Sequence, residues 1–418
     1  MLELDAAAEF DLALEEEFFA SIPFRHGVLR IEMTAPGAQP YLARTADLRR
    51  AAERLLRPPE ANTKRLNLRA VAARIRYRVT GSKFEQRFTL YQQARQDFPR
   101  SYRELLRLRP PALLKVNLRN EYPRCYVTRR IRADEAFYLG PFSSRRAADA
   151  FAEHFLDLFK IRRCQIKIRR DPQFPGCIYS EMKMCLAPCF AGCTKQEYDA
   201  EAGRVLAALA SCGASLTQSL EAEREAASQA LDFERAAALH KRIEKAADAL
   251  RALPDLARRI EDLNLVILTR TAEEKTIAVF PMHSGMLAEP VFLRFAEMSS
   301  EPRSVEEILR RALQPPARAP FEAAHSTTVV GLASDHDASL PAIEENARAR
   351  YGLREASPDL PEHLALLARW FYSKPREGEI LFRDADWPYR RILRACGRLL
   401  ASPRSPRAGA SSPPQQSS

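Results

Sequence analysis

Apolar positions in the first third of the chain follow both helical and strand-like periods. Residues 1–20 carry their apolar side chains among acidic ones, which predicts a short acidic helix. Residues 21–120 combine brief strand-like runs with helical patterns, a mixture typical of a small α+β domain. The length of 418 residues leaves room for more than one domain. We therefore predict an α+β protein with several domains.

The next segment changes from a strand pattern to a helix pattern and then to a cysteine-rich loop. Residues 121–142 predict a β-hairpin that turns near residue 134. In the helix that follows, phenylalanines recur at every fourth position from Phe151 to Phe159, so they form one buried stripe. Hairpin, helix and cysteine loop together predict a module over 121–195.

Helical composition dominates the segment that follows. Residues 196–255 are rich in Ala, Glu, Arg and Leu, which are good helix formers. The pattern breaks around Asp232-Phe233, so we predict an antiparallel helical hairpin. Two helices cannot bury both of their faces by themselves, and the hairpin therefore needs a partner.

The last third of the chain loses its regular pattern. Three strand-like runs predict a small β-rich domain over 256–312, and a Pro-rich linker follows at 313–322. Residues 323–400 are weakly patterned and are interpreted as an α/β remnant. The tail at 401–418 lacks the apolar residues needed for a core and is expected to be disordered.

The charge balance narrows the class of partner. The formal net charge is +11, although the first 20 residues contain only acidic charged side chains. This basic excess favours nucleic acid or another polyanion as partner. No run of 18 apolar residues exists, so no membrane partner is expected. We also see no signal peptide, and we expect a cytoplasmic protein.

A cysteine cluster is the strongest candidate for site chemistry. Four cysteines recur with the spacing C-x12-C-x7-C-x3-C. Thiolates in this number suit a zinc ion or an iron–sulfur cluster, whereas a disulfide framework would need an oxidising compartment. Cys193 is a possible additional or replacement ligand, and the three isolated cysteines are interpreted as buried small hydrophobes. The clustered metal candidates are Cys164, Cys177, Cys185 and Cys189.

Basic side chains surround this cluster. Their density favours contact with a nucleic-acid backbone, although a solvated basic face would have the same composition. The candidate DNA-binding residues here are Lys160, Arg162, Arg163, Lys167, Arg169 and Arg170.

Three sequence motifs in this order resemble the UvrC family of bacterial nucleotide-excision repair. FYLGPFSSRRAADAF resembles the family's segment before its cysteines, and PGCIYSEMKMCLAPC resembles the cysteine segment itself. LDFERAAALHKRIEKAADAL resembles the UVR motif, a helical hairpin that pairs with a similar hairpin of the partner UvrB. The resemblance implies a metal or iron–sulfur centre, binding to DNA and binding to a UvrB-like protein.

The family begins with a GIY-YIG nuclease domain, whose tyrosines, arginine and metal-binding glutamate act on the scissile phosphate. The corresponding positions here are Leu29, Ala51 and Leu90. Leucine offers neither an oxygen ligand for Mg²⁺ or Mn²⁺ nor a phenol for proton transfer. The resemblance therefore implies a nuclease domain without activity. Its surviving residues, with a possible role in holding DNA phosphate, are Tyr41, Arg44 and Arg50.

The UVR-like hairpin also carries a predicted partner face. Small alanines permit close helix approach, and one phenylalanine supplies a large apolar anchor. The alternative is that these residues close the core of the hairpin itself. The residues are Leu231, Phe233, Ala236, Ala237 and Leu239.

Three functions remain compatible with the sequence. The first is a UvrC-like repair protein that binds DNA and UvrB without cutting, since no Asp-rich nuclease site or helix-hairpin-helix pattern is recognised after residue 300. The second is an active endonuclease making one incision with Mg²⁺ or Mn²⁺, in which Glu85 is recruited as ligand. The third is a protein-interaction adaptor that uses only the cysteine cluster and the hairpin.

Overall fold

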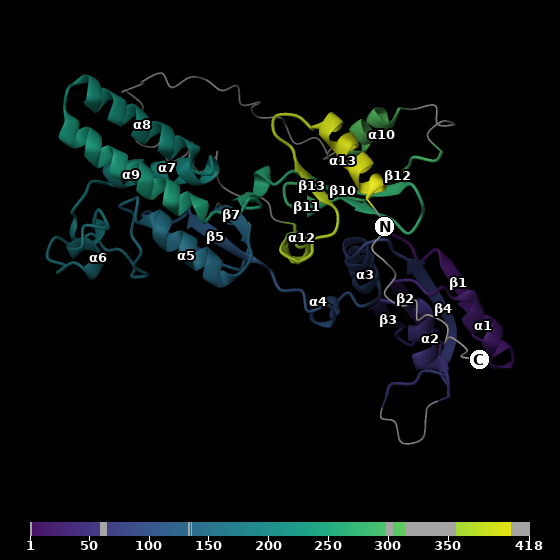
Figure 1. The fold of residues 1–418 in the computed structure, drawn as a ribbon. Helices are drawn as coiled ribbons and strands as arrows, with labels where there is room; N and C mark the ends of the chain where they lie inside the picture. The colour runs from purple at the N-terminus through teal and green to yellow at the C-terminus, as the bar shows by residue number, and fades with distance from the viewer. Residues whose placement is uncertain are drawn as a thin grey trace, which may run out of the picture.

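The computed structural model describes residues 2–58, 65–132, 134, 136–297, 304–314 and 357–402. In these ranges the strands form three separate sheets with helices packed against them, which confirms an α+β protein with several domains. In Figure 1 the middle module and its helical hairpin lie to the left, and the N-terminal domain lies below the C-terminal sheet on the right.

The N-terminal domain is built on an antiparallel four-stranded sheet. In spatial order its strands are β1 (Ala6–Glu9), β4 (Ala72–Val79), β2 (Gly27–Met33) and β3 (Tyr41–Thr45). Its helices are α1 (Glu15–Ser21), α2 (Leu48–Leu56), α3 (Lys83–Asp97) and α4 (Tyr102–Leu105). Asp47 and Ser82 cap α2 and α3, because each side chain accepts a hydrogen bond from a first-turn amide.

The first 20 residues differ from the single acidic helix that we predicted. They contain β1, a 3₁₀ turn at Leu12–Leu14 and only then α1. Because β1 pairs with the outer edge of β4, Glu9 lies 3.0 Å from Arg74 of that strand, and Asp5, just before β1, lies 3.1 Å from Arg78. The segment is therefore an edge strand of the N-terminal domain, fixed by backbone pairing and by ion pairs that local periodicity does not reveal.

The middle module has its own sheet, and this sheet corrects the predicted hairpin. The strands in spatial order are β6 (Cys125–Thr128), β5 (Ala112–Asn117), β7 (Ala136–Phe142) and β8 (Arg258–Arg259). β6 and β7 do not pair with each other, since β5 lies between them and bonds to both. β5 is almost wholly buried, so it takes the central place, and the module begins before residue 121.

Helix α5 (Arg145–Leu156) covers this sheet with the predicted aromatic stripe. Ser144 caps it by accepting a hydrogen bond from the Ala147 amide at 3.1 Å. The ring centroids of Phe151 and Phe155 are 5.4 Å apart, and all three phenylalanines of the stripe are buried. The three side chains form the predicted stripe, with Phe159 lying just beyond the C-terminal end of α5.

The helical segment contains three helices where two were predicted. They are α7 (Lys195–Ala210), α8 (Ala214–Gln229) and α9 (Phe233–Arg251). The extra break falls at Gly213, whose φ of 93° suits glycine, and the predicted break at Asp232 begins α9. The α8–α9 hairpin packs onto α5, so the module itself buries part of its apolar face.

The C-terminal sheet joins two segments that the sequence pattern had separated. Its strands are β9 (Leu265–Arg270), β10 (Thr276–His283), β11 (Met286–Leu287), β12 (Val291–Arg294) and β13 (Glu379–Phe382). β13 pairs with β9, so the predicted β-rich domain and the α/β remnant are one unit. β9 is almost entirely buried and thus needs partners on both edges.

Three helices cover the two faces of this sheet. α12 (Leu360–Phe371) packs on the face toward the N-terminal domain, whereas α10 (Val305–Ala312) and α13 (Tyr389–Ala401) pack on the opposite face. Residues 315–322 of the predicted linker, 323–356 of the predicted remnant and 403–418 of the predicted tail lie outside the described residues.

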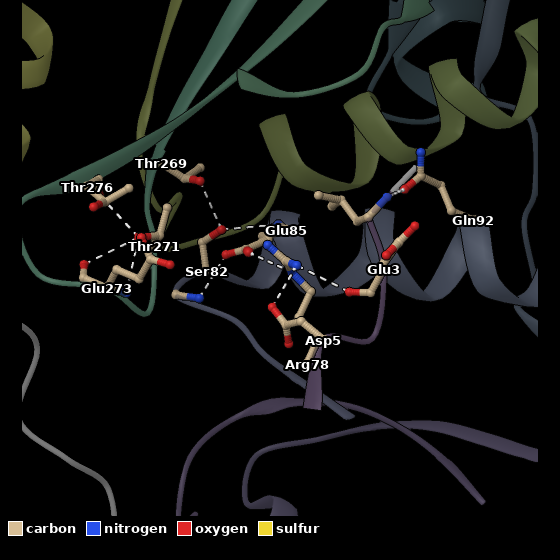
Figure 2. A network of polar contacts seen from close by, with 12 residues as sticks. Glu3, Asp5, Arg78, Ser82, Glu85, Gln92, Thr269, Thr271, Glu273 and Thr276 are labelled. Atoms are coloured by element: carbon tan, nitrogen blue, oxygen red, sulfur yellow. Dashed lines mark hydrogen bonds and ion pairs between the residues drawn. The ribbon is translucent and has the colours of Figure 1, made fainter. Parts of the chain in front are cut away.

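A polar network fastens the N-terminal domain to the C-terminal sheet (Figure 2). Ser82 donates a hydrogen bond to Thr269 at 3.1 Å, across the boundary between the two units. Beside it, Glu85 is 1% exposed, accepts a 2.9 Å hydrogen bond from the Gly81 amide and lies 3.5 Å from the Arg78 guanidinium. Burial raises the pKa of Glu85, and these two partners oppose the rise.

A buried histidine in the same interface gives stability a specific pH dependence. His363 on α12 packs against Phe88 and Tyr91 of α3, and its Nδ1 accepts a 3.0 Å hydrogen bond from the Leu287 amide. Burial lowers the pKa of His363 to about 4 from its ordinary 6.5. Because the folded state binds this proton more weakly than the unfolded state does, the stabilisation is present above pH 6.5 and is lost as pH falls toward 4.

Acidification from pH 6.5 to 4 should lower the free energy of unfolding of both the wild type and the His363→Asn variant. We predict that the decrease is about 3 kcal/mol larger for the wild type. The asparagine Oδ1 can accept the same amide hydrogen bond but does not titrate. Urea unfolding of both proteins across this pH range tests the prediction. Carboxylates titrate in both proteins, so parallel curves would contradict it.

Candidate nucleic-acid interface

The cysteine loop connects α5 to α7 through short, tightly turned segments. Cys177 precedes helix α6 (Ile178–Glu181) and donates its amide hydrogen to Ser180 Oγ at 2.9 Å. Cys189 lies in a 3₁₀ turn, Pro188–Phe190, flanked by left-handed residues. The Cys189 carbonyl accepts a hydrogen bond from the Asp171 amide at 3.0 Å, which folds the two halves of the loop together.

The four predicted ligand cysteines influence one another electrostatically. Burial, together with the charges of the other three thiolates, raises the pKa of Cys185 to about 11. The Ala187 amide opposes this by donating to Cys185 Sγ at 3.3 Å. Four thiolates are the donor type of a zinc or iron–sulfur centre. Within the described ranges, no three Cys, His, Asp or Glu side chains are grouped closely enough to hold a metal ion.

The remaining cysteines divide into two environments. Cys193 is buried in the core of the module, and Cys125 and Cys396 are buried as the sequence analysis predicted. Cys212 is exposed, so its interpretation as a buried hydrophobe was wrong. It lies in the turn between α7 and α8, where its backbone has φ of 50°.

A groove of about 600 Å³ opens between the cysteine loop, the end of α5 and helices α7 and α9. Five cationic side chains line it and outnumber the two acidic ones, Asp157 and Glu201, while Met182 and Met184 add apolar, flexible surface. Such a surface can hold a phosphate backbone and contact bases at once. The cations are Lys160, Arg163, Lys183, Arg204 and Arg242.

The structure divides the predicted DNA-binding residues of this region. Lys160 and Arg163 line the groove, and Lys167, Arg169 and Arg170 are exposed on the loop. Arg162 was predicted to contact DNA, but its side chain is buried and does not belong to this surface. Its Nε donates to the Tyr122 carbonyl at 2.9 Å and its Nη1 to the Ile166 carbonyl at 2.8 Å, so it braces the loop from inside.

Sequence reasoning missed three cations of the groove. Lys183 lies beyond the basic run, and Arg204 and Arg242 lie on α7 and α9. Only the packing of α7 and α9 within the module brings Arg204 and Arg242 to the cysteine loop. The one signal in the sequence is Lys183, which lies within the cysteine segment.

Comparison with known proteins decides the family of this region. Residues 112–208 match the model of the UvrC/Cho excinuclease middle domain, and this range contains β5, β6, β7, α5, the cysteine loop and most of α7. The chain is UvrC-like. No solved structure matches it.

Curated relatives agree with this assignment. The UvrABC system protein C of Ruminiclostridium cellulolyticum is 31% identical over 173 residues, which are 41% of this chain and 28% of the relative. The protein of the same name from Nitratidesulfovibrio vulgaris is 30% identical over 182 residues, covering 44% of this chain and 25% of the relative. The matched part of the UvrC-like chain thus spans about a quarter of the length of these relatives.

The three positions that the sequence resemblance assigned to a nuclease site are apolar, and two of them are buried. Leu29 and Ala51 belong to the core of the N-terminal domain, and Leu90 is half-buried on α3. Tyr41 packs against the same core, whereas Arg44 and Arg50 are exposed on β3 and α2, with Arg50 3.6 Å from Asp47. These residues therefore form no cluster of oxygen ligands.

The alternative ligand Glu85 is engaged elsewhere. Its carboxylate lies inside the network that joins the N-terminal domain to the C-terminal sheet (Figure 2). Burial and the contact with Arg78 leave it inaccessible to a substrate phosphate. This placement argues against recruiting Glu85 for nuclease chemistry.

The hairpin residues of the predicted partner face differ in their burial. Leu231 is 72% exposed and Phe233 is 66% exposed, at the tip between α8 and α9, and Ala237 is exposed one turn later. Ala236 is half-buried and Leu239 is buried, and both pack against the core of the module. Leu239 was predicted to lie on the partner face, but the module already covers its side chain.

Among the helices of the described residues, none has the length and apolar character required to cross a bilayer.

Proposed function

We propose that this UvrC-like chain binds DNA in nucleotide-excision repair and contacts a UvrB-like partner without cutting the strand itself. The observation that carries the proposal is the groove at the cysteine loop. It lies where the chain is similar to UvrC, and its cations come from the loop and also from the UVR-like hairpin.

The charge of the groove supports a polyanionic ligand. Two of its cations are paired, because Arg163 lies 2.8 Å from Asp157 and Arg204 lies 2.8 Å from Glu201. Lys183 and Arg242 have no ion pair with any residue in the described part of the chain. Their positive charge is therefore available to a ligand, and release of counterions from DNA would favour binding.

Binding to DNA tests the proposal. We predict that Lys183→Gln combined with Arg242→Gln weakens binding to a lesion-bearing duplex by about tenfold and lowers the salt slope by about 2. Fluorescence anisotropy at several salt concentrations measures both quantities. The matched control combines Lys241→Gln with Arg224→Gln, which removes two hairpin cations outside the groove. Equal affinity of the two double variants would contradict the groove as the interface.

We propose further that the four clustered thiolates hold one zinc ion or iron–sulfur cluster. The centre would act as a structural clip that fixes the loop and hence the groove. The support is the mutual electrostatic influence of the four cysteines and the Ala187 amide aimed at Cys185 Sγ.

Catalytic silence of the N-terminal domain is part of the proposal. Apolar side chains at Leu29, Ala51 and Leu90 support it, as does the engagement of Glu85 in the domain joint. Incision of a lesion-bearing duplex with Mg²⁺ or Mn²⁺ and loaded UvrB tests it. We expect no nick; a metal-dependent nick would establish the endonuclease alternative.

The exposed tip of the hairpin supports binding of a UvrB-like helical hairpin. We predict that Phe233→Ala weakens this binding by about 2 kcal/mol or more, the usual size for a large apolar anchor, and leaves the melting temperature unchanged. Leu239→Ala is the contrasting variant, because its buried side chain should affect stability first. Calorimetric titration with purified UvrB measures the affinity. An unchanged affinity for Phe233→Ala would remove the tip from the interface.

A further inference from the structure

A cavity of about 230 Å³ lies where helix α13 passes the outer strand of the C-terminal sheet. Three consecutive residues of β13 line it, although successive side chains of a strand point to opposite faces of the sheet. The cavity therefore runs along the backbone edge of β13. Its other wall is α13, which packs beside this strand (Figure 1). The lining residues are Glu379, Ile380, Leu381, Arg391, Arg394 and Arg398.

The outer edge of β13 carries backbone groups without partners. Among the described strands, β13 pairs only with β9. The Arg383 amide donates a 2.9 Å hydrogen bond to the Asn264 carbonyl, which continues this pairing by one residue. Hydrogen-bonded positions alternate along an antiparallel pair, so the N–H and C=O groups of Ile380 and Phe382 point away from β9. No described residue bonds to the outward groups of Ile380.

Arginines of α13 give the cavity a positive charge. Arg391, Arg394 and Arg398 are spaced three and four positions apart, so they lie on one face of the helix. Arg398 Nε donates to Glu379 at 3.0 Å, which neutralises the acidic side chain of the lining. Arg391 and Arg394 are exposed and have no ion pair with any residue that the structure describes. Two positive charges therefore remain for a ligand.

A peptide strand fits these groups better than a phosphate backbone does. The outer edge presents hydrogen-bond donors and acceptors side by side, and an extended peptide carries both kinds of group. Phosphate oxygens only accept hydrogen bonds, so the outward carbonyl of Ile380 would repel them. Acidic side chains at alternate positions of an extended peptide all point to one face, and Arg391 and Arg394 lie on one face of the sheet with the rest of α13.

We propose that the outer edge of β13 binds an extended acidic segment of a partner protein, which adds a strand to the C-terminal sheet. The backbone of the segment would pair with Ile380, and its acidic side chains would contact Arg391 and Arg394. The site goes beyond the proposed repair function, because it involves neither the cysteine loop nor the UVR-like hairpin.

Peptide binding by the whole chain tests the site. The probe is a short fluorescein-labelled peptide in which glutamate and valine alternate, and fluorescence anisotropy measures its affinity. We expect Arg391→Gln combined with Arg394→Gln to weaken binding about tenfold, because two ion pairs are lost. The matched control combines Arg390→Gln with Arg311→Gln, two exposed arginines that do not line the cavity. Equal affinities of the two double variants would overturn the proposal.

Backbone pairing has a test of its own. Methylation of alternate amide nitrogens removes the donors from one edge of the peptide and leaves the other edge intact. One of the two alternating series should lose binding and the other should keep it, because only one edge faces β13. Equal binding of the two series would contradict strand addition.

A competition experiment separates a peptide ligand from nucleic acid. We expect that a short oligothymidylate does not displace the peptide; displacement would assign the cavity to nucleic acid and overturn the proposal. The groove variant Lys183→Gln/Arg242→Gln should bind the peptide as the wild type does, so failure of the repair proposal would remain distinguishable.

Discussion

Gly81→Ala should destabilise the protein by about 3 kcal/mol or more, with separation of the N-terminal domain from the C-terminal sheet. A Cβ at this position would lie far inside van der Waals contact with the backbone carbonyl carbon, Cα and oxygen of Thr271. Backbone atoms cannot turn aside as a flexible side chain can, so one unit must move. The same movement would pull the Gly81 amide from Glu85 and Ser82 from Thr269 (Figure 2).

Urea unfolding and limited proteolysis measure this effect. The control is Gly203→Ala, at a glycine within α7 where an added Cβ meets no atom within 4 Å. Alanine there should stabilise the helix by up to about 1 kcal/mol. Similar small effects of the two substitutions would show that the joint between the domain and the sheet is not tightly packed in solution.

Cys185→Ser should abolish metal binding at the proposed thiolate centre and unfold the cysteine loop. Thiolate centres of this type contribute on the order of 10 kcal/mol of binding free energy, and a hydroxyl is a poor replacement for one of four thiolates. Elemental analysis should find one zinc ion or one iron–sulfur cluster per wild-type chain, and visible absorption distinguishes the two. Because Cys185 is on the loop that lines the groove, affinity for DNA should fall with the metal.

The control for this substitution is Cys212→Ser, because Cys212 is exposed in the turn before α8. Its metal content and melting temperature should match those of the wild type. A wild-type protein purified anaerobically with neither zinc nor iron would contradict the metal proposal, and so would unchanged metal content in Cys185→Ser.

Short-range sequence patterns predicted correctly those elements that contacts between near neighbours in the chain stabilise. The aromatic stripe of α5 follows from a repeat of four, and the break before α9 follows from the capping residue Asp232. The α+β class followed from the alternation of strand and helix periods. Family resemblance added the cysteine loop, and the match over residues 112–208 agrees with it.

Strand pairing was where local patterns failed. β5 enters between β6 and β7, and β13 joins β9 after a separation of about a hundred residues. A strand chooses its neighbours by the apolar surface that they bury together, and that surface is a property of the assembled sheet. The apolar run of a strand says that it is buried but not which strand lies beside it.

The candidate sites divide in the same way. Sequence alone placed Lys160 and Arg163 beside the cysteines, because they are neighbours along the chain. Only the tertiary structure turned Arg162 inward and brought Arg242 to the same groove. Side-chain direction and long-range packing decide such convergence, whereas composition determines only that the chain carries an excess of positive charge for an anionic partner.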